Sequence, residues 1–182
     1  MGCDIHMYVE YGNIEDNKNR IEKGEQPYWE SFGGRINPGR DYILFGYLSQ
    51  GVRYDTEKGF EARGLPNDLG YWSRSESRYY IIPDGQERYE GAVYLSTALQ
   101  WHQSYRCKLT YDKNGNPTHV GNPDWHSHSW LTTKEFEKAI KLCQRDKNCW
   151  GVSMQYKALL AAMKSFERSK THEARVVFWF DN

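Results

Sequence analysis

The stretch Cys3-Asp4-Ile5-His6-Met7-Tyr8-Val9-Glu10-Tyr11 alternates apolar and polar side chains. Successive side chains of an extended strand point to opposite faces, so the apolar and polar residues separate. One face would carry Cys3, Ile5, Met7 and Val9, and the other Asp4, His6, Tyr8 and Glu10. We therefore expect a half-buried strand over this stretch, with a polar face that can carry chemistry.

A second stretch, Arg175 to Phe180, is apolar after its first residue and lacks alternation. A continuous apolar run of this length is typical of a strand that is covered on both faces. We expect this strand to lie beside the first one near the centre of a sheet. Asp181, which follows it, would then fall near Asp4 or His6.

Three helices are predicted between these strands. Arg40 to Gln50 places Leu44, Phe45 and Leu48 on one face and ends before Gly51. A capping box, Thr132-Thr133-Lys134-Glu135, begins a second helix, and about 152–169 forms a third.

The remaining segments carry weaker signals. Tyr105–Tyr111 and Thr118–Val120 are predicted to form a hairpin, because Asn114-Gly115 between them favours a tight turn. Asn13–Gln26 is polar and is expected to be a loop or loose hairpin, and Gly51–Gly91 a long irregular excursion. Tyr94–Leu99 is compatible with a strand or a helix. The order of elements predicts a single α+β domain over residues 1–182, with a mixed, mainly antiparallel central sheet and about three helices.

Composition excludes several classes of function. Lys and Arg number 24 and Asp and Glu number 24, so the net charge is zero. Proteins that grip long nucleic acid carry a basic excess, so we expect no long nucleic acid partner. No apolar run approaches the roughly 20 residues that span a bilayer, so no membrane partner is expected either. The four cysteines form no CxxC pair, which favours reduced thiols and a cytoplasmic location.

Asp4 and His6 lie two residues apart on one strand, so their side chains can converge on one ion or one phosphate. With Asp181 they form a candidate set of metal ligands, and His6 is also a candidate acid–base catalyst. The alternative is a polar strand face with one carboxylate–imidazole hydrogen bond.

His126 and His128 form a second candidate cluster. In an extended segment they would share a face, and imidazole with carboxylate suits a divalent metal such as Mn, Zn or Mg. Both are candidates for catalysis and for metal binding. The alternative is a polar loop before a helix, with both histidines bonded to backbone.

Arginines and aromatic residues supply a candidate ligand-binding set. Arginine matches phosphate oxygens, and aromatic rings stack on bases. The set comprises Arg40, Tyr42, Arg53, Arg63 and Trp130. For any single arginine, surface salt bridging is the simpler interpretation.

Taken together, several short blocks resemble a family of small uncharacterised bacteriophage and prophage proteins that open MGCDIH and end VFWFDN. The blocks are Met1–His6, Arg40–Phe45, Gly51–Arg53, Arg63–Pro66, His126–Thr132 and Val177–Asn182. The family carries no established activity. The resemblance implies a phage accessory protein in the cytoplasm of an infected host cell, and such proteins often act against host immunity.

Three hypotheses follow. The first is hydrolysis of a phosphodiester in a small nucleotide, for example a host immune second messenger, by a histidine base or a divalent metal. The second is a sponge that binds and sequesters such a nucleotide without cleaving it. The third is a protein–protein inhibitor of a host enzyme, for which the aromatic content of 15% would supply contacts. A homo-oligomer is compatible with all three.

Overall fold

A computed structural model describes residues 2–182, which contain eight strands and six helices. They divide into two compact units, residues 2–73 with 127–182 and residues 74–126, which are described separately. The first unit holds β1 (Asp4–Asn13), α1 (Ile14–Glu22), β2 (Glu30–Ser31), α2 (Tyr42–Leu48), β7 (His126–Thr132), α5 (Thr133–Gln144), α6 (Met154–Glu167) and β8 (His172–Asp181). The second holds β3 (Tyr79–Ile82), β4 (Ala92–Tyr94), α4 (Leu95–Tyr105), β5 (Leu109–Tyr111) and β6 (Pro117–Val120), and α3 (Tyr71–Glu76) lies at the boundary.

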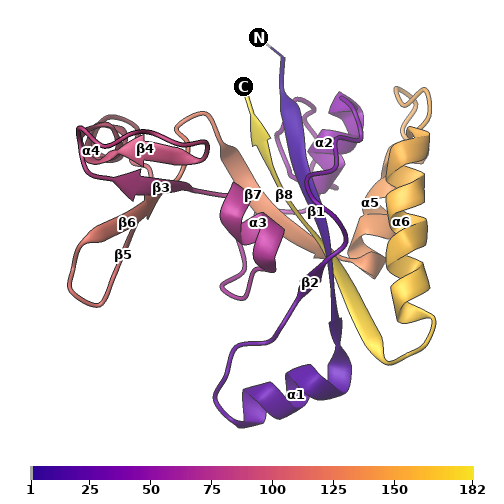
Figure 1. Cartoon of the computed structure of the whole chain (residues 1–182). Coiled ribbons are helices and arrows are strands. Elements are labelled where there is room, and N and C mark those ends of the chain that lie inside the picture. Colours follow the sequence, from indigo (N-terminus) through magenta and orange to yellow (C-terminus); the bar gives the residue numbers. More distant parts are fainter. Residues whose placement is uncertain (1) are drawn as a thin grey trace. The chain divides into compact units, whose positions relative to one another are not determined.

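The sheet of the first unit has the strand order β2-β1-β8-β7 (Figure 1). Its centre is the antiparallel pair β1 and β8, which runs from Asp4 opposite Asp181 to Asn13 opposite His172. The prediction that these two strands are neighbours is therefore confirmed. Because β1 is the first strand in the sequence and β8 the last, their pairing brings the two ends of the described chain side by side in the sheet.

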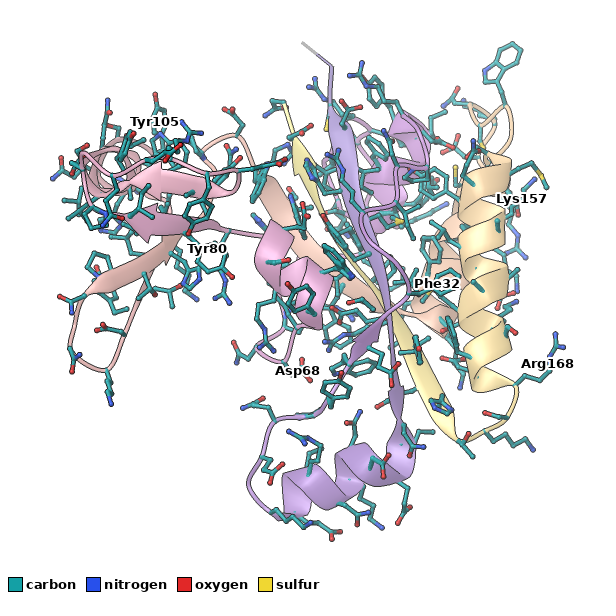
Figure 2. All side chains as sticks on the ribbon, viewed as in Figure 1. Phe32, Asp68, Tyr80, Tyr105, Lys157 and Arg168 are labelled. Carbon is teal, nitrogen blue, oxygen red and sulfur yellow. The ribbon has the colours of Figure 1, made fainter. Side chains whose placement is uncertain are left out.

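One face of this sheet builds the main core. Cross-strand pairs Ile5–Phe180, Met7–Phe178 and Val9–Val176 point to the same side. Helices α5 and α6 lie together on this side (Figure 1). They contribute the buried residues Phe136, Ile140, Tyr156, Leu159 and Met163. Lys157 points away from the sheet on the outer side of α6 (Figure 2), as expected for an amphipathic helix.

The other face of the β1–β8 pair is also covered. Tyr8 and Trp179 are almost completely buried there, and their rings stack with centroids 5.2 Å apart. The residues Ala174–Phe180 are buried without interruption. This burial on both faces agrees with the missing alternation in the apolar stretch.

A buried ion network fastens a loop to this second face. Arg175 lies opposite Glu10, and its Nε donates to Glu10 Oε2 at 2.7 Å. Its Nη1 and Nη2 donate to the side chain and backbone oxygen of Asp68, at 2.8 and 2.9 Å. The guanidinium also lies 3.9 Å from the centroid of the Trp29 ring. Asp68, labelled in Figure 2, belongs to the segment before α3.

The carboxylate of Glu10 completes the network. Its Oε1 accepts the backbone N–H of Gly70 at 2.8 Å and also the hydroxyl of Ser73. Burial alone would raise the pKa of Asp68, but hydrogen bonds from Arg175 and Trp29 outweigh it and hold the pKa below its ordinary value. Every charge in the network is thus paired, which buried charges require.

The second unit has its own four-stranded sheet, in the order β4-β3-β6-β5. Strands β3 and β4 are parallel, and the pairs β3–β6 and β5–β6 are antiparallel. The predicted hairpin is confirmed as β5 and β6, but its first strand is shorter than predicted, because Tyr105 is the last residue of α4. A small core fills this unit, made of Val93, Ala98, Cys107, Leu109 and Val120.

The α+β class is confirmed, but the expectation of one central sheet and about three helices is wrong. Residues 2–182 form two sheets and six helices. The loop expected at Asn13–Gln26 contains α1, whose first turn is capped by Asn13 through the N–H groups of Glu15 and Asp16. The ambiguous segment is divided, since β4 ends at Tyr94 and α4 begins at Leu95. No helix within residues 2–182 is both long and apolar enough to cross a bilayer.

Replacing Arg175 by Met tests the buried network. The change leaves Glu10 as a buried carboxylate without its cationic partner, so we expect a loss of about 3–5 kcal/mol in the free energy of unfolding. Urea denaturation of the whole chain measures this. The matched control is Lys164→Met, because the Lys164 side chain is 47% exposed and its partner Glu137 is partly exposed, and the expected cost is below about 1 kcal/mol. Equal costs for the two variants would show that the network does not hold the fold.

Candidate functional site

The candidate site lies where β1 begins and β8 ends, and its register is unusual. Asp4 and Asp181 occupy directly opposite positions on adjacent antiparallel strands. Like charges in this arrangement repel and destabilise a sheet. Each carboxylate must therefore be compensated locally, and the compensating groups define the site.

Asp181 is held by two donors from β1. Its Oδ1 accepts the backbone N–H of Asp4 at 3.1 Å, and its Oδ2 lies 2.8 Å from His6 Nε2. His6 is only 7% exposed. Burial lowers the pKa of His6 below its ordinary value, although the hydrogen bond to Asp181 acts in the opposite direction. A neutral imidazole that donates from Nε2 to Asp181 keeps its basic lone pair on Nδ1.

Asp4 is compensated by Arg40. The guanidinium forms a two-pronged contact, with Nε 2.6 Å from Oδ1 and Nη2 2.9 Å from Oδ2. This contact holds the pKa of Asp4 below its ordinary value. Gly2 allows the approach, because a Cβ built there would meet Arg40 Nη1 at 2.3 Å. Close packing against Arg40 thus explains why a glycine suits position 2, just before β1.

Arg53 and Tyr42, both predicted as ligand-binding residues, also lie near the start of β1 and the end of β8. Arg53 has a left-handed backbone, with φ of 59°, and its Nη2 donates to the side-chain oxygen of Asn182 at 3.0 Å. The guanidinium lies 5.9 Å from the centroid of the Tyr42 ring. The Tyr42 hydroxyl in turn accepts the backbone N–H of Cys3 at 3.2 Å.

We name this group the terminal cluster. It brings together six of the residues that the sequence predicted for a site: Asp4, His6, Arg40, Tyr42, Arg53 and Asp181. Sequence reasoning missed Asn182 and Arg35. Arg35 is exposed, and its positive charge lowers the pKa of both Asp4 and His6. No motif surrounds Arg35, so only proximity to the strand ends could have identified it.

The predicted pair His126 and His128 lies at the start of β7, on either side of Ser127. His128 stacks on Trp179, with ring centroids 5.8 Å apart, and His6 stacks on the same indole at 5.4 Å. Ser127 has a left-handed backbone, with φ of 50°. This conformation departs from the regular extended backbone on which the prediction for the two histidines was based. The unit boundary falls after the first residue of β7, so His126 belongs to the second compact unit and the rest of β7 to the first.

Arg63 and Trp130 form a separate group at the start of α5. Arg63 contacts both carboxylate oxygens of Glu135, at 3.0 and 2.5 Å, and its guanidinium lies 5.1 Å from the centroid of the Trp130 indole. Arg63 lowers the pKa of Glu135 to about 2. Glu135 is also the second member of the predicted capping box with Thr132. Arg63 therefore contacts Trp130 of β7 and Glu135 of α5 at the same time, and it links the two elements.

A pocket of about 490 Å³ adjoins the terminal cluster and shares Arg40 and Tyr42 with it. Such a volume lies within the range typical of small-molecule sites. One wall is Pro38–Ile43, and the other includes Cys149, Trp150, Gly151, Ser153 and Gln155. Hydrogen bonds tie the walls together, from Ser153 Oγ to the oxygen of Pro38 at 3.3 Å and from Tyr156 Oη to the oxygen of Gly39 at 3.0 Å.

Three of the predicted metal ligands, Asp4, His6 and Asp181, lie together in the terminal cluster and contact one another or Arg40. No group of three or more His, Cys, Asp or Glu side chains among residues 2–182 is arranged to hold a metal ion. Both carboxylate oxygens of Asp4 contact Arg40, and those of Asp181 contact β1. A divalent ion at this position would share the Asp4 carboxylate with Arg40 or compete with it.

Comparisons of the chain with protein-family models, with curated proteins and with solved structures found no match. The terminal cluster and its pocket are therefore the features of the molecule that point to a function.

The pKa of His6 offers a direct test of the cluster. In a ¹H–¹³C NMR titration, we expect the His6 ring to titrate below the ordinary value of 6.5. Asp181→Asn removes the interaction that raises the pKa, so the midpoint should fall further. His6→Gln assigns the resonance. A midpoint at or above 6.5 in the wild type would contradict the buried, neutral imidazole.

The same shift predicts how stability depends on pH. Because burial depresses the pKa of folded His6, its contribution to stability is complete above pH of about 6.5 and is lost as pH falls through the folded pKa. In urea denaturation at pH 7 and pH 5, His6→Gln should therefore lose less stability on acidification than the wild type. Identical pH dependence in the two proteins would exclude His6 as the titrating group.

Proposed function

We propose that this chain hydrolyses a phosphodiester bond in a small phosphate-bearing nucleotide, with His6 as the general base. The single observation that carries the proposal is the buried His6–Asp181 pair at 2.8 Å, beside Arg40 and Arg53 and next to a pocket of about 490 Å³. A neutral histidine with a depressed pKa is the form that accepts a proton near neutral pH.

In this mechanism, His6 Nδ1 takes a proton from the water that attacks phosphorus. Asp181 orients the ring through Nε2 and stabilises the imidazolium that forms, as the carboxylate does in hydrolytic triads. Arg40 and Arg53 bind phosphate oxygens and offset the charge that develops on them. The pocket between Pro38–Ile43 and Cys149–Gln155 would receive the remainder of the nucleotide.

A metal-dependent form of the same activity uses three of the five metal ligands predicted from the sequence, without His126 and His128. A Mn, Zn or Mg ion would draw on Asp4, His6 and Asp181, and it would compete with Arg40 for Asp4. Carboxylate and imidazole donors suit these ions. Assays with added metal and with a chelator separate the two forms.

A nucleotide sponge is the second candidate. The observation that favours it is the low exposure of His6, at 7%, beside more exposed arginines. Arg40, Tyr42 and the pocket could hold a nucleotide while the imidazole only donates a hydrogen bond. The resemblance to phage proteins adds that the nucleotide would be an immune second messenger in the cytoplasm of an infected cell.

The hydrolase is tested by incubating the chain with a panel of cyclic mononucleotides and dinucleotides, followed by chromatography and mass spectrometry. Arms with Mn²⁺, Zn²⁺, Mg²⁺ and EDTA are included. We expect His6→Gln to lower the rate at least about 100-fold, the usual contribution of a general base. His119→Gln, in the second unit, is the control and should retain the wild-type rate.

Intact nucleotides under every condition would contradict hydrolysis. Recovery of an unmodified nucleotide from a heat-denatured complex would instead support the sponge. If no nucleotide in the panel is cleaved and none raises the melting temperature of the protein, the proposal that the protein binds a nucleotide is contradicted.

Arg40 is tested separately by Arg40→Lys. Lysine keeps the charge but cannot form the two-pronged contact, so we expect the dissociation constant of the bound nucleotide to rise by about tenfold. Isothermal titration calorimetry measures it. Arg168→Lys at the end of α6 is the matched control, because it makes the same exchange outside the site. An unchanged dissociation constant in Arg40→Lys would remove Arg40 from the binding site.

A further inference from the structure

Two free thiols lie in contact at the end of α5, in a place that the proposed chemistry does not use. Cys143 Sγ and Cys149 Sγ are 3.3 Å apart. Cys143 occupies the last turn of α5 and is completely buried. Cys149 is partly exposed and lines the pocket next to Trp150. The pair therefore connects the core to one wall of the pocket.

The backbone between the thiols is folded so that they meet. The N–H of Asp146 donates to the oxygen of Cys143, and the N–H of Cys149 donates to the oxygen of Asp146, both at 3.0 Å. These two successive turns bring Cys149 back over the end of the helix. The proximity is thus a consequence of local geometry rather than of a long flexible loop.

The side chain of Asp146 fixes this turn to its surroundings. Its Oδ2 accepts the hydroxyls of Tyr47 and Tyr54, each at 2.7 Å, and its Oδ1 accepts the N–H of Asn148 at 2.9 Å. The hydrogen bonds from Asn148 and the tyrosines limit the motion of the segment. The two sulfur atoms are consequently held near each other in the reduced protein.

We propose that Cys143 and Cys149 are a redox modification site that forms a reversible intrachain disulfide with a glutathione-type disulfide as the oxidant. The sulfur atoms need to approach by only about 1.3 Å to reach the length of a disulfide bond. The bond would link the pocket wall at Cys149–Gly151 directly to α5. This inference does not depend on the proposed function.

The chemistry is a double thiol–disulfide exchange. The partly exposed Cys149, as its thiolate, attacks one sulfur of glutathione disulfide and releases one glutathione thiolate. Cys143 then loses its proton and attacks Cys149 Sγ, and the second glutathione thiolate leaves. Two protein thiols are oxidised, and one glutathione disulfide is reduced to two glutathione molecules. Burial raises the pKa of the Cys143 thiol, which assigns it the second, intramolecular step.

The test treats the purified whole chain with glutathione disulfide, or with dithiothreitol as the reduced reference. Both samples are quenched with acid, alkylated with N-ethylmaleimide in denaturant and digested with trypsin. We expect the oxidised protein to lose two of its four reactive thiols. Mass spectrometry should find peptides 142–145 and 148–157 joined by a disulfide, and dithiothreitol should separate them.

Serine variants make the result specific. Cys143→Ser should stop at a stable glutathione adduct on Cys149, because the resolving thiol is missing. Cys107→Ser in the second unit is the matched control and should still yield the joined peptides. Full alkylation of Cys143 and Cys149 in the oxidised wild type, or a persistent glutathione adduct on wild-type Cys149, would overturn the proposal.

Discussion

The register of β1 against β8 is the constraint on which the first unit depends. Side chains alternate with a period of two, so a slip of one residue would exchange the two faces of either strand. The observed register aligns Ile5, Met7 and Val9 with Phe180, Phe178 and Val176 on the core side. The same alignment leaves Asp4, His6, Tyr8 and Glu10 on the opposite face, which carries the polar groups of the terminal cluster.

On that opposite face, the charges that lie across from each other differ between the two ends of the strands. At one position Glu10 meets Arg175, a pair of opposite charges that is buried and fully hydrogen-bonded. Near the strand ends Asp4 meets Asp181, a pair of like charges that is partly exposed. The first arrangement satisfies the rules of sheet stability, and the second departs from them. Local departures of this kind concentrate at functional sites, because stability alone would not select them.

The sequence predicted those parts of the fold whose signals are local. Alternation over Cys3–Tyr11, the apolar run before Asp181 and the capping box at Thr132 each correspond to an observed element. Helix α1 escaped prediction because its residues are mostly polar and its start depends on the side chain of Asn13. The hydrogen bonds of Arg175 to Glu10 and Asp68 join residues that are far apart in the chain, so no local sequence pattern could predict them. Pairing of the strand ends was predictable, and it located Asp181 beside His6.

Arg40 links the terminal cluster to its pocket, and this double position limits how a ligand can bind. Its guanidinium neutralises Asp4, and its side chain also lines the pocket. Burial lowers the pKa of His6, so above that pKa the imidazole is neutral and adds no positive charge to balance a bound phosphate. Under the proposed function, a phosphate would therefore share Arg40 with Asp4 or bind to Arg53 and Arg35. A ligand that draws Arg40 away would leave Asp4 facing Asp181 across the strands, and their repulsion would favour its return. The like-charge pair thus acts against loss of the Arg40–Asp4 contact, and it favours ligands that bind without breaking it.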